Sequence, residues 1–488
     1  MQRISIDPIT RLEGHRRIDI FLNDEGDVAN AYLVIPELRG FEKFAEGRRV
    51  EEMIDITPRI CGVCPEAHHF AATKACDAVF HVEVPPAAKK LRELFYSAFY
   101  VADHTVHFYI LGGPDFVLGP DAPVAERNIL GVIHKVGVEI GTRVIKSRGM
   151  AMDIIGTLGG RKVHPTFGLP GGVAKFITEE ERAEFERIAR EEVEFALFTL
   201  QVFREIVLKN KAYVDMIVSD AYTMPTYYMG MVDVNNKVNF YDGKIRVVDP
   251  DGKEFVKYSP EQYLDVVAER VEPWTYLKFP YLKKVGWKGL VTGKDSGVYQ
   301  ATPLSRLNAS DGMATPRAQE AYEEMYKMLG GKPVHHTLAT HWARLVELLY
   351  AAERLLELST DPEITNTKVR NIPTEKPTEG VGIVEAPRGT LTHHYITDEK
   401  GIVKKANLIV GTTNNYAPIA IAIKKAAQVM IQKGKVISEG VLNRVEMAFR
   451  SYDPCFGCAT HSLPGEMPLE VRIFDADGNI KDVLKRNC

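Results

Sequence analysis

Residues 59–64 of this chain read Arg-Ile-Cys-Gly-Val-Cys, and residues 453–458 read Asp-Pro-Cys-Phe-Gly-Cys. The two Cys-x-x-Cys pairs stand near opposite ends of the sequence, so Cys64 and Cys455 are separated by most of its 488 residues. Thiols paired in this way in a reducing compartment bind metals or act as redox pairs. If the four thiols meet at one site, the first and last parts of the chain must fold against each other. The spacing alone leaves a metal site, a redox pair and a structural site open.

The composition is ordinary for a soluble globular protein of more than one domain. Hydrophobic residues make up 45% and charged residues 26% of the sequence, and the formal net charge is −4, so no basic face for nucleic acid or membrane is indicated. No run of about 18 apolar residues predicts a membrane span, and residues 1–15 show no signal segment. Six cysteines are too few for a disulfide scaffold. We therefore expect a cytoplasmic chain with no nucleic-acid partner and no membrane span.

The spacing of hydrophobic residues predicts an α+β fold that is mainly helical with small β-hairpin and sheet additions. Helices are expected at residues 64–112, 127–156, 179–208, 316–329, 336–358, 416–433 and 438–450. Strands are expected in hairpins at 17–35 and 236–258, and around 381–384, 391–396 and 406–410. Residues 273–300 are expected to be a loop. Three histidines are expected on a helix as packing or interface residues: His335, His336 and His341.

Five segments are expected along the chain. An N-terminal hairpin with a connecting segment (1–60) is followed by a helical core with the first cysteine pair (61–235) and by a β-hairpin and loop insertion (236–315). Helices, a small sheet and the second cysteine pair occupy 316–461, and a C-terminal tail occupies 462–488. Residues alternate on both sides of a turn in this tail, which predicts a hairpin peripheral to the helical core.

Six motifs occur in the order found in the large subunit of nickel–iron hydrogenases, and the chain resembles that family from residue 5 to residue 461. They are Arg-Leu-Glu-Gly-His at 11–15, Arg-Gly-Phe-Glu at 39–42, the first cysteine pair with His68, Asp-His at 103–104 before His-Phe-Tyr at 107–109, Glu-Ala-Pro-Arg-Gly at 385–389, and the second cysteine pair with His461. The sequence resembles most the cytoplasmic, multi-subunit branch that includes F420-non-reducing hydrogenases and archaeal sulfhydrogenases. The resemblance implies an oxidoreductase that cleaves H2 reversibly and heterolytically into protons and electrons.

By this resemblance the four cysteines hold a nickel–iron centre. Cys61 and Cys455 would be terminal ligands of nickel. Cys64 and Cys458 would bridge nickel to an iron that carries carbon monoxide and two cyanides. Soft thiolates suit these metals, and a coordinated cysteine is deprotonated. The resemblance also implies that the Cys455 thiolate takes up the proton when H2 is cleaved.

Three charged residues match family positions close to this centre. Glu13 matches the glutamate that relays protons from the terminal thiolate, and Arg388 matches the arginine that overhangs the metal bridge. Asp103 matches the carboxylate that holds this arginine. Without the resemblance each would be interpreted as an ordinary charged residue in a loop, turn or helix, because such residues are mostly exposed. A guanidinium that stays charged would add electrostatic stabilisation to the reaction.

Two polar residues match positions that tune the centre. His68 matches a histidine that hydrogen-bonds a bridging sulfur, although a lone helix histidine is usually structural. Thr412 stands where the family often has a serine that donates to an iron-bound cyanide, but the preceding proline of the family is Gly411 here.

The resemblance also implies a second metal site: magnesium, or a similar divalent ion, is expected behind the centre, since hard oxygen ligands suit it. Its matched ligands are the Glu42 carboxylate, the His461 imidazole and the backbone carbonyl of Leu408.

The cysteine count implies a partner chain. An iron–sulfur cluster usually needs four cysteines, and beyond the two pairs the chain has Cys76 and Cys488. We therefore expect an iron–sulfur small subunit, further electron-transfer subunits, and a maturation chaperone and endopeptidase. Family members are commonly cut after the histidine of the last motif, and the matching bond here joins His461 to Ser462.

Three other functions fit the pattern less well. The homologous subunit of respiratory complex I shares the fold but lacks the nickel-binding cysteines. A zinc-dependent hydrolase would show an HExxH or similar motif, which this sequence lacks. A nucleotide-binding oxidoreductase would show a phosphate-binding glycine motif after a strand. Gly293-Lys294 is followed by Asp295 and not by Ser or Thr, so that motif is also missing. The sequence leaves the final electron acceptor open.

Overall fold

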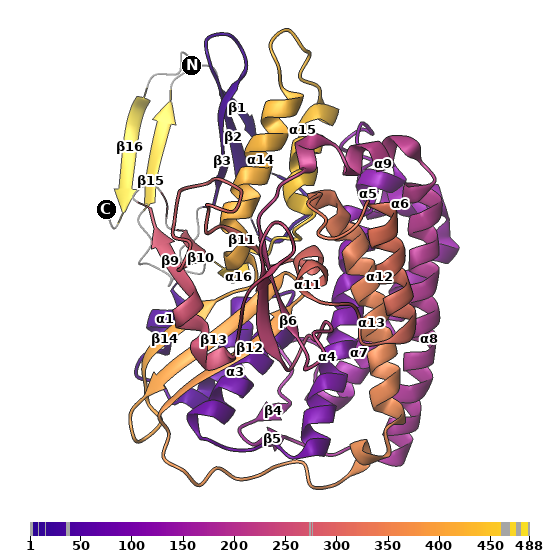
Figure 1. The fold of residues 1–488 in the computed structure, drawn as a ribbon, viewed down its shortest axis with the longest axis vertical. Coiled ribbons are helices and arrows are strands. Elements are labelled where there is room, and N and C mark those ends of the chain that lie inside the picture. The colour runs from indigo at the N-terminus through magenta and orange to yellow at the C-terminus, as the bar shows by residue number, and fades with distance from the viewer. Residues whose placement is uncertain are drawn as a thin grey trace.

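A computed structural model describes residues 3–7, 9–14, 16–35, 40–272, 275, 277–459, 469–474 and 480–486 of the chain. A block of long helices forms one side of the molecule, and small sheets with further helices form the other (Figure 1). Among the residues described, no helix combines the length and the apolar character needed to cross a membrane. The expected α+β class, mainly helical with small sheets, is confirmed.

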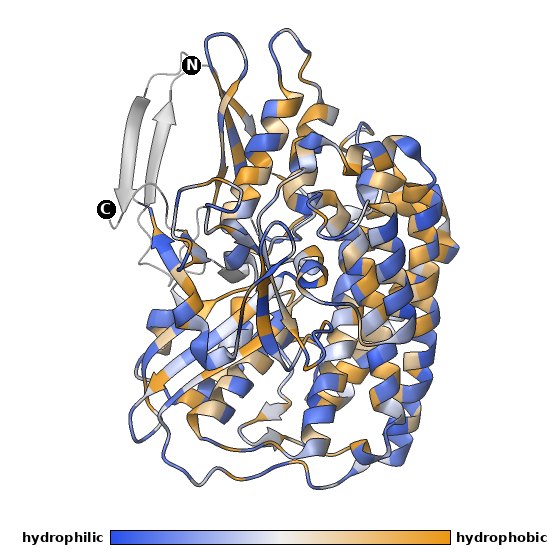
Figure 2. Ribbon diagram, in the orientation of Figure 1, coloured by the Kyte–Doolittle hydropathy of each residue, from blue (hydrophilic) through white to orange (hydrophobic). Residues whose placement is uncertain are grey.

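The helical block is built around one buried helix. The block contains α4 (Pro86–Val106), α7 (Val138–Gly159), α8 (Glu179–Phe203), α12 (Pro316–Met328) and α13 (Thr340–Thr360). Every residue of α13 from Thr340 to Ala352 is buried, as expected for a helix at the centre of a core. Figure 2 shows hydrophilic and hydrophobic turns alternating along α8, whose inner face packs on α13 and whose outer face is charged.

The sheets are small and are packed by helices. They are β1 (Arg3–Ile6), β2 (Arg17–Leu22) and β3 (Val28–Val34); β12 (Glu379–Ala386), β13 (Gly389–Thr397) and β14 (Val403–Ile409); and β11 (Tyr299–Gln300), β6 (Tyr227–Val232), β7 (Lys244–Val248) and β8 (Glu254–Tyr258), each in that spatial order. α3 (Pro65–Val79) lies so close to β12 that a Cβ atom at Gly382 would stand 2.1 Å from the carbonyl oxygen of Ala71. Any side chain at Gly382 would therefore displace α3, and α3 begins directly after Cys64.

Most of the expected elements are confirmed with shifted ends. The helix expected over 64–112 is two helices, α3 and α4, because Pro85 and Pro86 interrupt the pattern. The hairpin expected over 236–258 is the antiparallel pair β7–β8. The tail also forms an antiparallel pair, β15 (Leu469–Phe474) with β16 (Ile480–Arg486), at the edge of the molecule away from the helical block (Figure 1).

The loop expected at 273–300 is wrong in part. It contains β10 (Lys278–Leu282), which pairs antiparallel with β9 (Val267–Val271). Pro280 in the middle of β10 obscures the strand pattern in the sequence. A two-stranded sheet leaves one edge of each strand free, so the missing N–H of a proline is tolerated there.

The placement of two histidines on a helix is also wrong. His335 and His336 precede α13, which begins at Thr340, and His341 alone of the three lies on it. The chain is extended at His336, which forms an isolated antiparallel bridge with Thr223, and the His335 carbonyl accepts the N–H of Met224, so the helix begins only after them.

The two ends of the chain meet beside α3, as the fold prediction required. α14 (Tyr416–Met430) packs against β3, and α15 (Glu439–Arg450) leads the C-terminal part to Cys455. The backbone of Cys455 then forms an isolated parallel bridge with Glu13. This pairing places the N-terminal motif and the second cysteine pair side by side.

Candidate metal centre

Three of the four predicted thiol ligands converge in the interior. The Sγ atoms of Cys61, Cys64 and Cys455 all lie within 4.8 Å of one another, and all three residues are buried. The Sγ of Cys61 is 2.9 Å from that of Cys64 and 3.4 Å from that of Cys455. The fourth cysteine, Cys458, lies on the short helix α16 (Phe456–Ala459), where the structure describes the backbone only. Buried, convergent sulfur atoms are a donor set that suits nickel and low-valent iron better than hard cations.

The first cysteine pair is built to hold negative charge. The Cys61 Sγ accepts backbone N–H bonds from Val63 at 3.2 Å and from Cys64 at 2.8 Å. The hydrogen bond to Cys61 and burial together raise the pKa of the Cys64 thiol well above its ordinary value. A metal cation reverses this preference because it stabilises the thiolate outright. The N–H donors at the Cys61 Sγ and the three convergent sulfur atoms therefore fit a bound cation, which would keep the Cys64 sulfur in its thiolate form.

Glu13 lies at the second cysteine pair. Its Oε2 is 3.3 Å from the Cys455 Sγ and accepts the backbone N–H of Gly457 at 2.7 Å. A Cβ atom at Gly457 would stand only 2.2 Å from the other carboxylate oxygen, so a glycine is required between the two cysteines. The glutamate predicted as a proton relay is therefore within reach of the thiol predicted to feed it.

Arg388 stands at the turn between β12 and β13 and is buried at 4% exposure. Its Nη1 donates to Asp103 at 2.9 Å, as the sequence predicted, and its Nη2 lies 2.8 Å from the Asp453 carboxylate. Burial opposes its charge, but Asp103 and Asp453 outweigh burial and raise the pKa of Arg388. Negative charge on the Cys64 and Cys61 sulfur atoms acts on the pKa of Arg388 in the same direction.

Asp453 is a site residue that the sequence interpretation missed. It stands two residues before Cys455 with a positive φ of 53°, a conformation that Asp adopts more readily than most residues. Burial raises its pKa to about 7 although Arg388 opposes the shift. The signal was an acid inside the second cysteine motif, but a carboxylate beside a cysteine pair does not reveal that it faces an arginine far away in sequence.

Comparison with known proteins decides the family. The family model described as nickel-dependent hydrogenase matches residues 39–128 and 278–461, and a HoxL-like model matches residues 3–38. The first model alone covers more than half of the chain and includes both cysteine pairs. This chain belongs to the nickel-dependent hydrogenase family.

The similarity to individual relatives extends over almost the full length of this chain. The chain is 52% identical over 485 residues to the F420-non-reducing hydrogenase iron-sulfur subunit of Archaeoglobus profundus, and the match covers 99% of this chain and 100% of the relative. It is 36% identical to the NAD-reducing hydrogenase HoxS subunit beta of Cupriavidus necator, over 99% of this chain and 100% of that one. The crystal structure of an NAD+-reducing [NiFe]-hydrogenase in the H2-reduced state matches with a TM-score of 0.88 and 35% identity, covering 94% of this chain and 100% of that chain. The resemblance found in the motifs is confirmed, and the chain is a hydrogenase large subunit by fold and family.

Two polar residues predicted to tune the centre lie close to it. The Thr412 hydroxyl accepts the backbone N–H of Cys455 at 3.0 Å, so it holds the second cysteine pair in place. His68 is fully buried on α3, and its Nδ1 lies 3.1 Å from the Nε2 of His393. Their predicted contacts with a cyanide and with a bridging sulfur remain predictions.

Two of the predicted magnesium ligands, Glu42 and Leu408, contact each other. The Glu42 carboxylate on α1 (Phe41–Ala45) accepts the backbone N–H of Leu408 at 2.8 Å, and His461 lies outside the described residues. The Lys278 ammonium is 3.6 Å from the same carboxylate. The carboxylate therefore already has a positive neighbour, and a divalent ion would have to share it with Lys278.

A cavity of about 210 Å³ borders the first cysteine pair and Asp103. It contains Glu66, a buried carboxyl on α3 that the sequence did not single out, whose pKa is raised to about 8 by burial. One of its oxygens makes no hydrogen bond among the residues described. Arg148 and Met152 of α7 and Lys162 and Val163 just beyond this helix also line the cavity.

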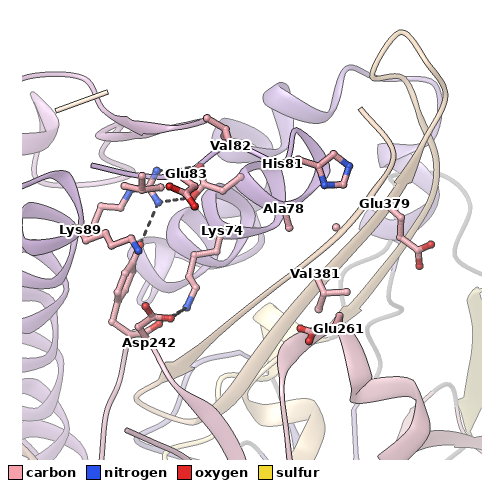
Figure 3. A pocket seen from close by; sticks show the side chains of 15 residues that line it. Lys74, Ala78, His81, Val82, Glu83, Lys89, Asp242, Glu261, Glu379 and Val381 are labelled. Atoms are coloured by element: carbon pink, nitrogen blue, oxygen red, sulfur yellow. Dashed lines mark hydrogen bonds and ion pairs between the residues drawn. The ribbon is translucent and has the colours of Figure 1, made fainter. Parts of the chain in front are cut away.

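A larger cavity, about 780 Å³, lies at the far end of α3 from the thiols and is shown in Figure 3. Two ion pairs form within its lining, Lys74 with Asp242 and Arg92 with Asp77. Lys74 contacts Asp242 at 3.4 Å, as the dashed line in Figure 3 marks, and Glu379 contacts His394 at 2.7 Å. The reaction predicted for the chain belongs to the buried thiols and not to this cavity.

Proposed function

We propose that the chain is the catalytic large subunit of a multi-subunit nickel–iron hydrogenase that cleaves H2 reversibly and heterolytically. The observation that carries the proposal is the convergence of Cys61, Cys64 and Cys455 beside Glu13 and Arg388. By the motif match, Cys61, Cys64, Cys455 and Cys458 would hold a nickel–iron centre whose iron carries carbon monoxide and two cyanides. When bound, this centre supplies the Lewis acid and the redox change that H2 cleavage needs.

The protein's own residues would move the proton. The Cys455 Sγ accepts the proton that H2 releases and passes it to the Glu13 Oε2, 3.3 Å away. The Gly457 N–H holds this carboxylate in the receiving orientation. Burial of the site excludes water, which would otherwise compete for the proton.

Arg388 would contribute a fixed positive charge beside the thiolates. Asp103 and Asp453 bind one end nitrogen each, so the guanidinium is held in one orientation. Such a fixed donor stabilises developing negative charge without reorganising during the reaction.

We infer that electrons leave through an iron–sulfur small subunit, with further electron-transfer subunits beyond it. The relatives are named as subunits of hydrogenases, and such names imply that further chains belong to the complex. Large apolar side chains are exposed along α6 (Ile129–Val136), α7 and the segment that follows α7, and exposed apolar patches mark interaction surfaces. They are Leu130, Val138, Ile145 and Val163.

Three smaller proposals complete the function. We propose that the subunit works in the cytoplasm. A maturation chaperone and an endopeptidase would act on the chain, with cleavage between His461 and Ser462. Magnesium would bind to Glu42, His461 and the carbonyl of Leu408, and the contact between Glu42 and the Leu408 backbone supports this.

Metal analysis of the complex that co-purifies with the chain tests the main proposal. We expect equimolar nickel and iron in this subunit, and H2-dependent reduction of a viologen dye. Zinc, or no metal, together with no reduction of the dye, would contradict the proposal.

A further inference from the structure

Two histidines of the fourth motif, His104 and His107, have no role in the proposed function. His104 follows Asp103 on α4, and its Nε2 lies 3.0 Å from the Oε2 of Glu347 on α13. Both side chains are fully buried. Burial lowers the pKa of His104 to about 4, so the ring is neutral and donates its Nε2–H to the carboxylate.

Glu347 in turn binds Arg306 on α11 (Pro303–Ala309). The Nε and Nη2 of Arg306 donate to the two oxygens of Glu347 at 2.6 and 2.7 Å, a bidentate ion pair that is completely buried. His104, Glu347 and Arg306 therefore form a continuous chain of hydrogen bonds, called here the buried triad.

The other N–H groups of Arg306 reach the turn that carries Arg388. Its Nη1 donates to the Glu385 carboxylate at 3.1 Å and to the carbonyl of Ala386 at 2.9 Å. Its Nη2 donates to the carbonyl of Pro387 at 3.2 Å. All five N–H groups of the guanidinium are thus used, two on Glu347 and three on residues 385–387.

Side chains from three further residues hold the rest of this turn. The hydroxyls of Tyr96 and Tyr100 donate to the carbonyl of Glu385 at 2.6 and 2.7 Å. The Asn415 amide donates to the carbonyl of Arg388 at 2.9 Å. Side chains therefore donate hydrogen bonds to four consecutive carbonyls, those of residues 385 to 388. Arg306 is the donor to the two in the middle, Ala386 and Pro387.

We propose that Arg306 is a positioning residue. It fixes the backbone of Arg388 and thereby the position of the Arg388 guanidinium relative to Cys61 and Cys64. Glu347 and His104 keep Arg306 in place. Neighbouring residues of α4 thus act on opposite ends of Arg388: Asp103 binds its guanidinium directly, and His104 acts on its backbone through Glu347 and Arg306. The inference rests on the proposed function, since it assigns Arg306 to the reaction of the same centre.

The experiment compares Arg306→Lys with a matched buried arginine elsewhere. Arg92 is 1% exposed, binds Asp77, and donates to the carbonyls of Leu169 and Gly172, but it lines the cavity at the far end of α3. Both lysine variants lose a buried bidentate ion pair with a carboxylate, so their melting temperatures should fall by similar amounts. We expect Arg306→Lys to keep its nickel and iron but to lower kcat by about 10²-fold with a smaller change in KM, because a misplacement of about 1 Å has that effect on a positioned group. Arg92→Lys should stay close to the wild-type kcat.

Two readouts separate positioning from loss of structure. A crystal structure of metal-loaded Arg306→Lys should show the Arg388 guanidinium displaced from Asp103. In a double-mutant cycle, Arg306→Lys should add little to the kcat loss of Arg388→Lys, whereas the effect of Arg92→Lys should be independent. Glu347→Gln, which keeps the size of the side chain, repeats the test if Arg306→Lys does not fold.

The outcomes also separate this inference from the proposed function. Arg306→Lys or Glu347→Gln with full metal content, wild-type kcat and an unmoved Arg388 would overturn the inference alone. A kcat loss that only matches that of Arg92→Lys, or that adds fully to Arg388→Lys, would also overturn it. A wild-type complex without nickel would instead refute the proposed function, and the position of Arg388 in the variants would still test the positioning role.

Discussion

At the scale of single residues, the candidate centre depends on pairs of groups that meet from distant parts of the chain. Glu13 meets Cys455, and Arg388 meets Asp103 and Asp453, each at ordinary hydrogen-bonding or ion-pair distance. Cys455, Arg388, Asp103 and Asp453 are buried and Glu13 is partly buried, and a buried charge that loses its partner destabilises the folded state. Substitutions here should therefore act through one named contact each.

Replacing Cys455 by alanine should abolish both nickel incorporation and H2 oxidation, because it removes a thiolate ligand. Cys76→Ala is the matched control, since Cys76 is also buried but its Sγ contacts the carbonyl of Val50 and not the other thiols. The control should keep its metals and lose about 1 kcal/mol of stability. Metal analysis and an H2-uptake assay measure both variants, and normal H2 uptake by Cys455→Ala would refute the assignment of the centre.

Glu13→Gln should leave the metals bound while lowering hydrogen turnover and hydrogen–deuterium exchange by about 10²- to 10⁴-fold. The amide can still accept the Gly457 N–H, but it cannot carry the proton that the Cys455 thiol delivers. Glu13→Asp, which keeps a titratable carboxyl, should recover part of the rate. An exchange rate in Glu13→Gln equal to that of the wild type would show that another route carries the proton.

At the scale of elements, buried polar groups join the helices of the block. Glu192 on α8 is fully buried and accepts the Ser147 hydroxyl of α7 at 2.6 Å. Burial raises its pKa to about 8, while in the unfolded chain a glutamate titrates near 4.3. The folded state therefore keeps a proton that the unfolded state loses between these two values.

This proton predicts the direction of a pH effect on stability. As pH rises from about 4 to about 8, the unfolded state loses its proton first, so the contribution of Glu192 to stability falls by a few kcal/mol. Glu192→Gln removes the titration. We expect the variant to be more stable than the wild type at pH 8, with the difference shrinking towards pH 4, as measured by denaturant unfolding. A stability difference that does not change with pH would contradict the shifted pKa.

At the scale of the whole molecule, the exposed apolar surface of α6 and α7 should be covered by the small subunit. Ile145→Glu places a charge in the middle of this surface and should reduce co-purification of the partner at least about tenfold. Val234→Glu is the control, because Val234 is an exposed apolar residue away from these helices. Equal recovery of the partner with both variants would place the interface elsewhere.

The tail gives a second prediction at this scale. If the endopeptidase cuts between His461 and Ser462, the hairpin β15–β16 is removed from the active enzyme. Intact-mass measurement of the nickel-loaded subunit should then find a chain that ends at His461. An active, nickel-loaded chain that still ends at Cys488 would overturn the processing proposal and leave the family assignment standing.

The sequence by itself determined the class of chemistry and the class of fold. Two cysteine pairs are read directly as residue types, and ligand softness depends on residue type. Helical periodicity over α8 and α14 and alternation over β7 and β8 are local patterns, so the segments that carry them were predicted well. Glu13, Arg388 and Asp103 came from motif matches, and in the structure Glu13 contacts Cys455 while Asp103 binds Arg388.

The tertiary structure alone decided which residues act together. Glu66 and Arg306 carry no local signal, and the acid inside the cysteine motif at Asp453 does not reveal its partner, because an acid or an arginine in a sequence is expected at the surface until its partner is known. Their partners come from other elements: Arg388 for Asp453, and Glu347 and the turn at 385–387 for Arg306. Burial, which raises the pKa of Glu66 and removes water from the centre, exists only once the helices have packed. Contacts between residues hundreds of positions apart are products of packing, and no local pattern records them.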